Sequence, residues 1–507
     1  MSLTEAVVNN SLRSLIGPGA RLLLTRISNF LAEQNIESYV VGGLVRDALL
    51  GRATADIDLA VAADALEIAP RVASTLGGKY VLLDKISGAG RIIMVDREAP
   101  PNRVQWQLDF SSLEGNINQD LARRDFTINA MAIDLSQFRN DLSDVQLIDP
   151  FNGQDDLQRR VIRVVSDTAF PADAARLLRA VRLAAELGFN IDRKTETLIQ
   201  RYSSLIGSVA GERIREELLR LLSIAGGQLL VYLDELHLLT AVFPELEKAK
   251  QVEQPKEHFW DVFEHSLKTA GAVDFILRQG TWEYADEEAL VTVPWSVTLA
   301  QHFTEEIRSG STCRILLKLA ALLHDIAKPQ TKTIETDGRT RFLGHAIEGA
   351  AITDNILKRL RFSTREIKLV ETVVKYHLRP GQMSQQELPT QRAIYRFFRD
   401  TGETGIDILF LNLADHLATR GPQLNLPHWQ EHTRMTQYVL SRHFEQESLV
   451  RPSRLVDGHD LINIFTMSPG PKIGEILEAV REAQASGEIT TREEALSFVE
   501  RIRKEYA

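Results

Sequence analysis

The chain has 507 residues, of which 44% are hydrophobic and 25% charged, and its formal net charge is −10 at pH 7. This length predicts three or four domains, the composition is that of a soluble globular protein, and no apolar run reaches the ~20 residues that span a bilayer. The acidic balance excludes a protein whose whole surface binds nucleic acid, because phosphate binding needs clustered cations.

Cysteine usage and the N-terminus both predict a cytoplasmic protein. The single cysteine, Cys313, excludes an internal disulfide framework and suits a reducing compartment. It lies in an apolar helical pattern and is expected to be an inert core residue. The segment Met1–Asn10 lacks the basic-then-apolar pattern of a signal peptide.

The first 150 residues alternate between helical and strand-like patterns. Leucine and isoleucine recur at helical spacing up to about Ile36, and Ala65–Leu76 is a second predicted helix. Strands are predicted for the apolar runs Tyr39–Val41, Ile57–Val61, Tyr80–Leu83, Arg91–Val95 and Trp106–Phe110. This mixture indicates an α/β head.

Two motifs in the head carry chemistry. Gly42-Gly43 follows the first strand, where the missing side chains let backbone amides approach a phosphate next to a helix start. Asp56 and Asp58 stand at i and i+2 of the next strand, so both carboxylates share one face. Such a pair can bridge two divalent cations for phosphoryl transfer, whereas the alternative is a merely solvated strand.

After the turn Asp149–Gly153 the strand patterns nearly vanish. A helix is predicted from Asp173 to Leu187, ended by Gly188. From Arg159 to Arg220 there are 12 Lys and Arg against 8 Asp and Glu, a basic stretch that suits local RNA contact unless it is an ordinary solvated face. Near the C-terminus, two amphipathic helices are predicted, Ile473–Gln484 and Thr491–Ile502.

Gly42–Asp47 with Asp56 and Asp58 resembles the head of class II tRNA nucleotidyltransferases and bacterial poly(A) polymerases, in the DNA-polymerase-β-type nucleotidyltransferase superfamily. Further segments follow in that family's order up to about Arg220: Arg123–Ala130, Asp149–Gly153, Asp173 with Arg176 and Arg179, and Gly211–Ile214. The resemblance implies an α+β fold class, with a polymerase-β-type α/β head followed by an all-α body.

The resemblance also implies roles for the head residues. Asp56 and Asp58 would bind Mg²⁺, and Asp109 is a candidate third catalytic carboxylate, with a purely structural role as its alternative. Nucleotide binding is expected from Gly42, Gly43, Arg46, Arg123, Arg124, Asp125, Asn129, Asp173, Arg176 and Arg179. For Arg123, Arg124 and Asp125 the alternative is an ion pair that stabilises a strand–helix junction.

The family selects C or A with an acidic residue followed by arginine, here Asp173 and Arg176. At i and i+3 they would offer an acceptor and a fork-shaped donor to a base edge, unless they form only a salt bridge. The segment departs from the family pattern: Ala172 replaces an acidic residue and Ala174 a proline. These departures put in doubt whether both C and A are accepted.

His324-Asp325 is the second strong motif and resembles the HD superfamily of metal-dependent phosphohydrolases. The expected metal ligands are His265, His324, Asp325, His345, His377 and Asp415, with Lys328 as a phosphate contact. Imidazole and carboxylate ligands do not separate Mg²⁺, Mn²⁺, Ni²⁺ and Zn²⁺. The alternative is a helical scaffold that keeps the metal and only supports RNA binding.

The resemblance implies an enzyme that adds CMP and AMP from CTP and ATP to the tRNA 3′ end, as CCA, CC or A alone, and that also has a metal-dependent phosphohydrolase activity at the HD site. The alternatives are a poly(A) polymerase and an HD phosphohydrolase with a nucleotide-sensing head; a pure RNA-binding scaffold would tolerate loss of the carboxylates. Neither a membrane nor an obligate protein partner is expected. The predicted domains are a nucleotidyltransferase head (1–150), a helical neck for base recognition and RNA binding (151–250), an HD-type metal-binding domain (251–450) and a helical RNA-contacting tail (451–507).

Overall fold

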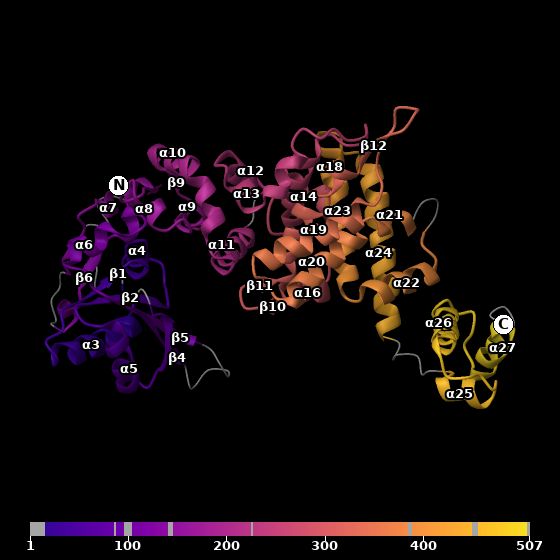
Figure 1. The fold of residues 1–507 in the computed structure, drawn as a ribbon, viewed down its shortest axis with the longest axis horizontal. Coiled ribbons are helices and arrows are strands. Elements are labelled where there is room, and N and C mark those ends of the chain that lie inside the picture. Colours follow the sequence, from indigo (N-terminus) through magenta and orange to yellow (C-terminus); the bar gives the residue numbers. More distant parts are fainter. Residues whose placement is uncertain are drawn as a thin grey trace. The chain divides into compact units, whose positions relative to one another are not determined.

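A computed structural model describes residues 16–85, 88–95, 104–139, 145–224, 227–383, 388–448 and 455–503. The expectation for Met1–Asn10 lies outside these residues. The chain divides into two compact units, Met1–Val209 and Ala210–Ala507, whose course Figure 1 follows by colour. The boundary falls inside the predicted neck, residues 151–250, and the four-part division remains a prediction.

The first unit is built on a seven-stranded sheet with the strand order β3-β4-β5-β2-β1-β6-β7. β2 and β5 pair in parallel, whereas the other neighbouring pairs are antiparallel. The strands are β1 (Ser38–Val41), β2 (Asp56–Val61), β3 (Lys79–Asp84), β4 (Ala89–Val95), β5 (Val104–Ser112), β6 (Ala132–Asp134) and β7 (Leu147–Ile148). Each strand predicted in the head is therefore confirmed.

β2 lies in the middle of this sheet, between β1 and β5. Its side chains alternate as expected: Ile57 and Leu59 are buried, Asp56 is exposed and Asp58 is half-buried. The predicted helix α5 (Ala65–Leu76) forms with those bounds and packs against β3, β4 and β5. The helix predicted near the N-terminus is α3 (Pro18–Ala32).

The rest of the first unit is mainly helical. Its helices are α7 (Gly153–Arg159), α8 (Ala169–Ala172), α9 (Arg176–Leu187) and α10 (Arg193–Tyr202). The prediction that a helix starts at Asp173 is wrong, because that residue has extended backbone angles, φ −151° and ψ 100°. Its carboxylate accepts a hydrogen bond from the Ala175 amide at 3.2 Å and so shapes the turn into α9. The predicted stop at Gly188 is confirmed, with a left-handed φ of 68°.

The second unit begins with a helical body. Four of its helices pack on one another, α14 (Val262–Ile276), α17 (Cys313–Leu323), α20 (Thr364–Tyr376) and α23 (Thr404–Arg420). α14, α17 and α23 are buried on nearly all sides, which explains their apolar sequences. Further helices surround them: α11 (Gly211–Ser223), α12 (Gln228–Glu235), α16 (Val297–Thr304), α19 (His345–Arg359), α22 (Gln391–Thr401) and α24 (Leu426–Ser448).

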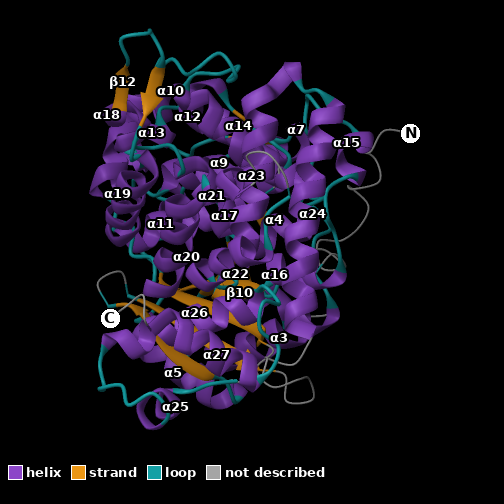
Figure 2. Cartoon of the chain, turned by 90° about the vertical axis from the view of Figure 1, so that its right-hand side faces the viewer, coloured by secondary structure: helices purple, strands orange, loops and turns teal. Residues whose placement is uncertain are grey.

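Strands in this unit are confined to two short hairpins, as far as the described residues show. They are β10 (Glu306–Arg308) with β11 (Ser311–Thr312), and β12 (Lys332–Ile334) with β13 (Thr340–Phe342). Figure 2 shows helices making up most of the chain. None of the described helices combines the length and the apolar character that crossing a membrane requires.

The last helices form a small cluster with its own hydrophobic core. They are α25 (Gly458–Asn463), α26 (Pro471–Ala485) and α27 (Arg492–Arg503), and the last two confirm the predicted pair. Leu461, Ile476, Val480 and Val499 contribute to the core. Arg396 of α22 binds both carboxylate oxygens of Glu482 in α26, at 2.8 and 2.6 Å.

Candidate active site and candidate metal centre

The turn between β1 and α4 (Gly43–Leu49) brings the backbone against a carboxylate of β2. Gly42 has a φ of 71°, which side chains rarely adopt, and a Cβ there would lie 2.7 Å from Asp58 Oδ2. The Gly43 amide nitrogen lies 3.4 Å from the same oxygen. The turn therefore needs glycine, and it places a backbone donor and an acidic acceptor at one point.

Asp58 is the centre of an acidic group on neighbouring strands. It shares β2 with Asp56 and is paired in parallel register with Asp109 of β5. Burial raises the pKa of the Asp58 carboxyl, and the charges of Asp109 and Asp56 raise it further, whereas Arg124 opposes the shift. A partly desolvated carboxylate among other carboxylates gains most from a nearby cation. This chemistry fits the hard, oxygen-seeking Mg²⁺ predicted for Asp56 and Asp58.

Asp109 itself is already paired. Arg91 of β4 lies opposite it, and the guanidinium Nε and Nη2 atoms each donate to a different oxygen of Asp109 at 2.7 Å. Both oxygens of the candidate third carboxylate therefore face a cation of the protein. Its catalytic role remains a prediction.

Four of the predicted nucleotide-binding residues form one hydrogen-bonded chain. Arg46 donates to Asn129 at 2.9 Å, Asn129 donates to Asp125 at 3.1 Å, and Arg179 donates to Asp125 at 3.2 Å. Burial opposes ionisation of Asp125, but Arg179, Asn129 and the Phe126 amide together hold the pKa of its carboxyl below the usual value. This series of hydrogen bonds links α4 to α9 and fixes the guanidinium groups of Arg46 and Arg179 in position.

The two neighbouring arginines of the head differ in their surroundings. Arg123 and Arg124 both pair with the buried Asp120, at 2.6 and 3.3 Å. Arg123 also pairs with Glu114, whereas Nη1 of Arg124 would lie 3.2 Å from a Cβ at Gly42. Arg124 thus reaches the acidic group, whereas Arg123 is directed to Asp120 and to the exposed Glu114.

The predicted base-reading pair is close in space although Asp173 is not helical. Nε of Arg176 lies 3.8 Å from Asp173 Oδ2. The Nη1 atom of Arg176 donates to the carbonyl oxygens of Ala169 and Arg124, at 3.3 and 3.4 Å. These carbonyl contacts hold the guanidinium at the start of α9, beside Arg124, which reaches the acidic group.

The residues predicted for the HD site converge from five segments of the body. His265 lies in α14, His324 and Asp325 directly follow α17, and Asp415 lies in α23. His345 starts α19 and His377 follows α20. All of these except Asp415 are buried.

Asp325 divides this centre into two halves. On the side of Oδ2 lie Nε2 of His324 at 3.1 Å and Nε2 of His265 at 3.6 Å, and His265 is 3.0 Å from Oδ1 of Asp415. On the side of Oδ1 lie Nε2 of His345 at 3.4 Å and Nε2 of His377 at 3.8 Å. The arrangement would allow one carboxylate to bridge two metal ions.

Three of the imidazoles are oriented by backbone carbonyls. Nδ1 of His324, His345 and His377 donates to the carbonyl oxygens of Ala321, Phe342 and Val374, at 2.8, 2.6 and 2.7 Å. Each Nε2 is thereby left as the lone-pair nitrogen that points inward, the usual outer contact of metal-binding histidines. The Nε2 atoms of His345 and His377 face each other at 3.3 Å, which two lone pairs tolerate only with a cation or proton between them.

The imidazoles of this centre differ in the direction of their pKa shifts. Burial lowers the pKa of His265 and His345, and it lowers that of His377 to about 3. Despite burial, the facing histidines and Lys328 hold the pKa of Asp325 well below its usual range. Burial opposes protonation of His324 too, but Asp325 and Asp415 raise its pKa, so a metal would take the place of its proton. Imidazole and carboxylate donors fit a divalent metal and do not specify which one.

Lys328, the predicted phosphate contact, is engaged within the centre. Its Nζ lies 2.6 Å from Asp325 Oδ2 and donates to Gln254 Oε1 at 2.7 Å. His258, which sequence reasoning missed, lies beside it: its ring centroid is 5.4 Å from that of His265. Burial, Lys328 and His265 lower the pKa of His258 to about 4.

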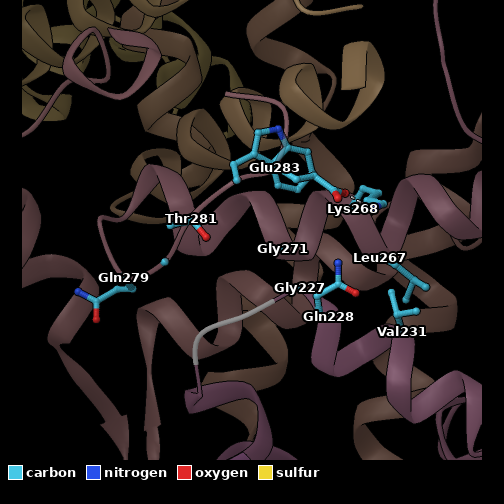
Figure 3. A pocket seen from close by; sticks show the side chains of 11 residues that line it. Gly227, Gln228, Val231, Leu267, Lys268, Gly271, Gln279, Thr281 and Glu283 are labelled. Atoms are coloured by element: carbon cyan, nitrogen blue, oxygen red, sulfur yellow. Dashed lines mark hydrogen bonds and ion pairs between the residues drawn. The ribbon is translucent and has the colours of Figure 1, made fainter. Parts of the chain in front are cut away.

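A separate cavity of about 420 Å³ lies between α12 and α14 (Figure 3) and contains none of the predicted site residues. Its charged pair is already satisfied, because Lys268 binds Glu283 and lies over the ring of Trp260 at 5.0 Å. We assign no ligand to it.

Three segments of the chain match known domain families. Residues 38–163 match the poly A polymerase head domain, 188–250 the "probable RNA and SrmB- binding site of polymerase A", and 295–420 the HD domain. The A-adding tRNA nucleotidyltransferase of Deinococcus radiodurans is 32% identical over 92% of this chain and 95% of its own. This chain belongs to the tRNA nucleotidyltransferase family.

A second relative and a solved structure agree with this family. The CC-adding tRNA nucleotidyltransferase of Thermus thermophilus is 33% identical, over 91% of this chain and 93% of its own. A solved complex of a CCA-adding enzyme with ATP has the same fold, with a TM-score of 0.63 and 22% identity over 97% of this chain and 96% of that one. The predicted family, the α+β fold class and the HD-type domain are confirmed.

The assignment of individual residues in this tRNA nucleotidyltransferase remains a prediction. The structure brings together the predicted head residues and the predicted HD residues, each as a group. Sequence reasoning missed Arg91, Asp120, Gln254 and His258, which contact these groups. Only Arg91 carried a usable signal, a charge within an apolar strand.

Proposed function

We propose that this protein joins CMP or AMP, from CTP or ATP, to the 3′ end of tRNA without a nucleic-acid template. The observation that carries the proposal is the contact of the Gly42-Gly43 turn with Asp58, beside Asp56 on the same strand. The membership in the tRNA nucleotidyltransferase family supports the substrate class.

The head residues would promote a single displacement at the α-phosphorus of CTP or ATP. The RNA 3′-oxygen forms a bond to this phosphorus while the bond to the bridging oxygen of the β-phosphate breaks, and pyrophosphate leaves. Asp56 and Asp58 would hold Mg²⁺, which, when bound, favours the ionised 3′-hydroxyl and neutralises the leaving group. Gly42 and Gly43, which bring the backbone close to Asp58, would let backbone amides approach the triphosphate.

The flanking arginines would orient the nucleotide. Arg46 is held by Asp47 and Asn129 and would supply positive charge near the triphosphate. Asp173 and Arg176 would select the base, with the guanidinium already fixed by two carbonyl oxygens. Fixed donors discriminate well, because a wrong base leaves them unpaired.

We further propose that the enzyme adds only part of the CCA end. Four relatives that match along about nine-tenths of the chain are one A-adding and three CC-adding enzymes. The departures at Ala172 and Ala174, beside the base-reading pair, agree with a restricted choice of nucleotide.

One assay tests both statements. Purified protein is given tRNA ending in the discriminator base, in C, or in CC, with CTP and ATP supplied separately, and product lengths are read on a gel. Addition of C to the first two substrates without A on the third, or of A to the third alone, supports both statements. Both additions together would support nucleotide addition and overturn the restriction to part of the CCA end. Long A tracts on unrelated RNA would instead identify a poly(A) polymerase, and no incorporation would leave the head as a nucleotide sensor.

The HD centre supports a second activity, hydrolysis of a phosphate ester. The supporting observation is the placement of four imidazoles around Asp325, with Asp415 beside His265 and Lys328 beside Asp325. We propose that this centre trims phosphate-blocked or cyclic-phosphate RNA ends to a free hydroxyl. The reaction would supply the 3′-hydroxyl that the head requires.

This activity is tested with 2′,3′-cyclic nucleotides and with 2′- or 3′-phosphate ends, each with Mg²⁺, Mn²⁺, Ni²⁺ or Zn²⁺. Phosphate release that His324→Ala abolishes supports the proposal. If the wild-type protein releases no phosphate with any of these metals, the centre is a scaffold and the proposed hydrolysis is wrong.

A further inference from the structure

A third cluster of ligand-type side chains lies in the body, apart from the HD centre. One ligand atom each from His302, Cys313 and Asp407 lie within 4.8 Å of one another. Among the described residues, the other clusters of this kind belong to the HD centre. The three residues come from α16, the start of α17 and α23, so the tertiary fold brings them together.

The cluster contains a carboxylate oxygen that the protein leaves unsatisfied. Asp407 is fully buried; its Oδ2 lies 3.0 Å from Nε2 of His302, whereas Oδ1 is buried without a hydrogen-bond partner. A buried carboxylate oxygen without a partner is unfavourable, and native structures nearly always satisfy it by protein, water or an ion. The thiol of Cys313, 2% exposed, is the neighbouring ligand-type atom.

We propose that His302, Cys313 and Asp407 bind a Zn²⁺ ion, with the fourth position open to water. Imidazole nitrogen, thiolate sulfur and carboxylate oxygen are the three kinds of ligand that zinc takes in proteins. Bond lengths of about 2.0–2.3 Å place tetrahedral ligand atoms roughly 3.3–3.7 Å apart, a separation that the cluster can meet with small side-chain movements. The sulfur ligand disfavours Mg²⁺ and Ca²⁺.

An ion could reach the cluster of His302, Cys313 and Asp407, and it would join three helices once bound. The His302 side chain is 13% exposed, so one side of the cluster is open, whereas Cys313 and Asp407 close the other. Binding replaces the thiol proton, which leaves to solvent, and the Nε2 proton that His302 shares with Asp407, which leaves to solvent or moves to Nδ1. A bound ion would tie α16 to α17 and α23, the two helices that also carry or precede the HD residues His324 and Asp415.

The chain offers an unusually clean test, because Cys313 is its only cysteine. The full-length protein is stripped of metal and titrated with Co²⁺, which replaces Zn²⁺ and gives a near-ultraviolet sulfur-to-cobalt charge-transfer band only when a thiolate binds it. The predicted HD ligands contain only nitrogen and oxygen, so this band reports the new site alone. We expect the band to appear, to saturate with Co²⁺ and to be displaced by Zn²⁺.

Two variants make the assignment specific. Cys313→Ser should lose the band and bind one metal ion fewer per chain, while Asp325→Asn, which damages the HD centre, should keep the band. His302→Gln serves as a second variant if the serine variant does not fold. It should weaken Co²⁺ binding, read from the band, by at least the roughly 10-fold lost when an outer contact of a metal site is removed.

The result that would overturn the proposal is equally direct. If folded wild-type protein saturates with Co²⁺ and shows no charge-transfer band, the cluster is only a buried ion pair beside a thiol. A band that persists in Cys313→Ser cannot come from this site and would also overturn it. Neither result depends on nucleotide addition or on hydrolysis.

Discussion

Arg91 and Asp109 form a two-point ion pair across neighbouring strands of the head, with both nitrogen–oxygen distances at 2.7 Å. Hydrogen bonding to Asp109 raises the pKa of Arg91, and the charges of Asp56 and Asp58 add to this shift although burial opposes it. A protein cation therefore stands beside the carboxylates that we expect to bind Mg²⁺. Its charge should weaken metal binding there.

Replacing this cation should strengthen the response to magnesium. In Arg91→Met, we expect the Mg²⁺ concentration for half-maximal CMP or AMP incorporation to fall by about 10-fold, which corresponds to ~1.4 kcal/mol of removed repulsion. Arg91→Lys keeps the charge and is the matched control. A half-maximal concentration that is unchanged or higher in Arg91→Met would show that the ion pair acts only by holding Asp109 in place.

The carboxylates of β2 should be indispensable. Asp56→Ala or Asp58→Ala is expected to reduce incorporation by more than the roughly 10–100-fold typical for loss of an outer contact, because each removes a metal ligand itself. The fold should persist, since Asp56 is exposed and burial disfavours the ionised form of Asp58, as its raised pKa indicates. Circular dichroism checks folding. Near-normal incorporation in either variant with Mg²⁺ would refute the assignment.

The base-reading pair should control which nucleotide is used. Arg176→Ala or Asp173→Ala should raise the barrier for the correct nucleotide by about 1–3 kcal/mol and affect the wrong ones less. The comparison is kcat/KM for CTP, ATP, UTP and GTP. Arg46→Ala is the control, because a contact to the triphosphate should weaken all four equally. Equal losses for all four nucleotides in the Arg176 variant would mark the pair as structural.

The sequence predicted those parts of the site that local patterns determine. The Gly42-Gly43 turn, the alternation that places Asp56 and Asp58 on one face, and the strand run Ile57–Val61 each depend on a few adjacent residues. The helix predicted from Asp173 failed because its carboxylate bonds the Ala175 amide, a local competition that favours an extended residue before the helix.

Contacts between distant segments could not be predicted in this way. His302 and Asp407 are 105 residues apart and meet only because α16 packs near α23. Arg91 finds Asp109 through the pairing of β4 with β5, which no short motif encodes. Composition and spacing thus indicated which ligand types were present, while tertiary packing determined their partners.

A buried ion pair in the body predicts how stability depends on pH. Glu366 in α20 is fully buried and lies 3.1 Å from Arg215 of α11. Burial opposes its ionisation, but hydrogen bonds from Ser363, Ser311 and Arg215 hold its pKa below the ordinary 4.5. Because the folded pKa is depressed, this contribution to stability is fully present above pH 4.5 and is lost as the pH falls through the folded pKa.

Glu366→Gln should therefore lower the free energy of unfolding at neutral pH by roughly 1–3 kcal/mol. The difference from wild type should shrink below pH 4.5, as measured by urea unfolding at a series of pH values. Glu371→Gln, on the same helix with only an ion pair to Lys368 at 3.4 Å, is the control and should change stability by less than about 0.5 kcal/mol. A difference that stays constant down to acid pH would assign the effect to packing.

The two proposed activities should be separable by mutation. Asp56 and Asp58 belong to the unit that ends at Val209, whereas His324 and Asp325 belong to the unit that begins at Ala210. His324→Ala removes an imidazole that Ala321 orients toward Asp325, so it should abolish phosphate release from cyclic-phosphate ends. It should leave incorporation of CMP or AMP into tRNA with a free 3′-hydroxyl within about twofold of wild type, since residues in separate units without shared partners act additively.

Asp58→Ala should show the reverse pattern, with hydrolysis retained and incorporation lost. A folded His324→Ala variant that also loses incorporation would show that the HD centre supports the head, and the sites would then not be independent.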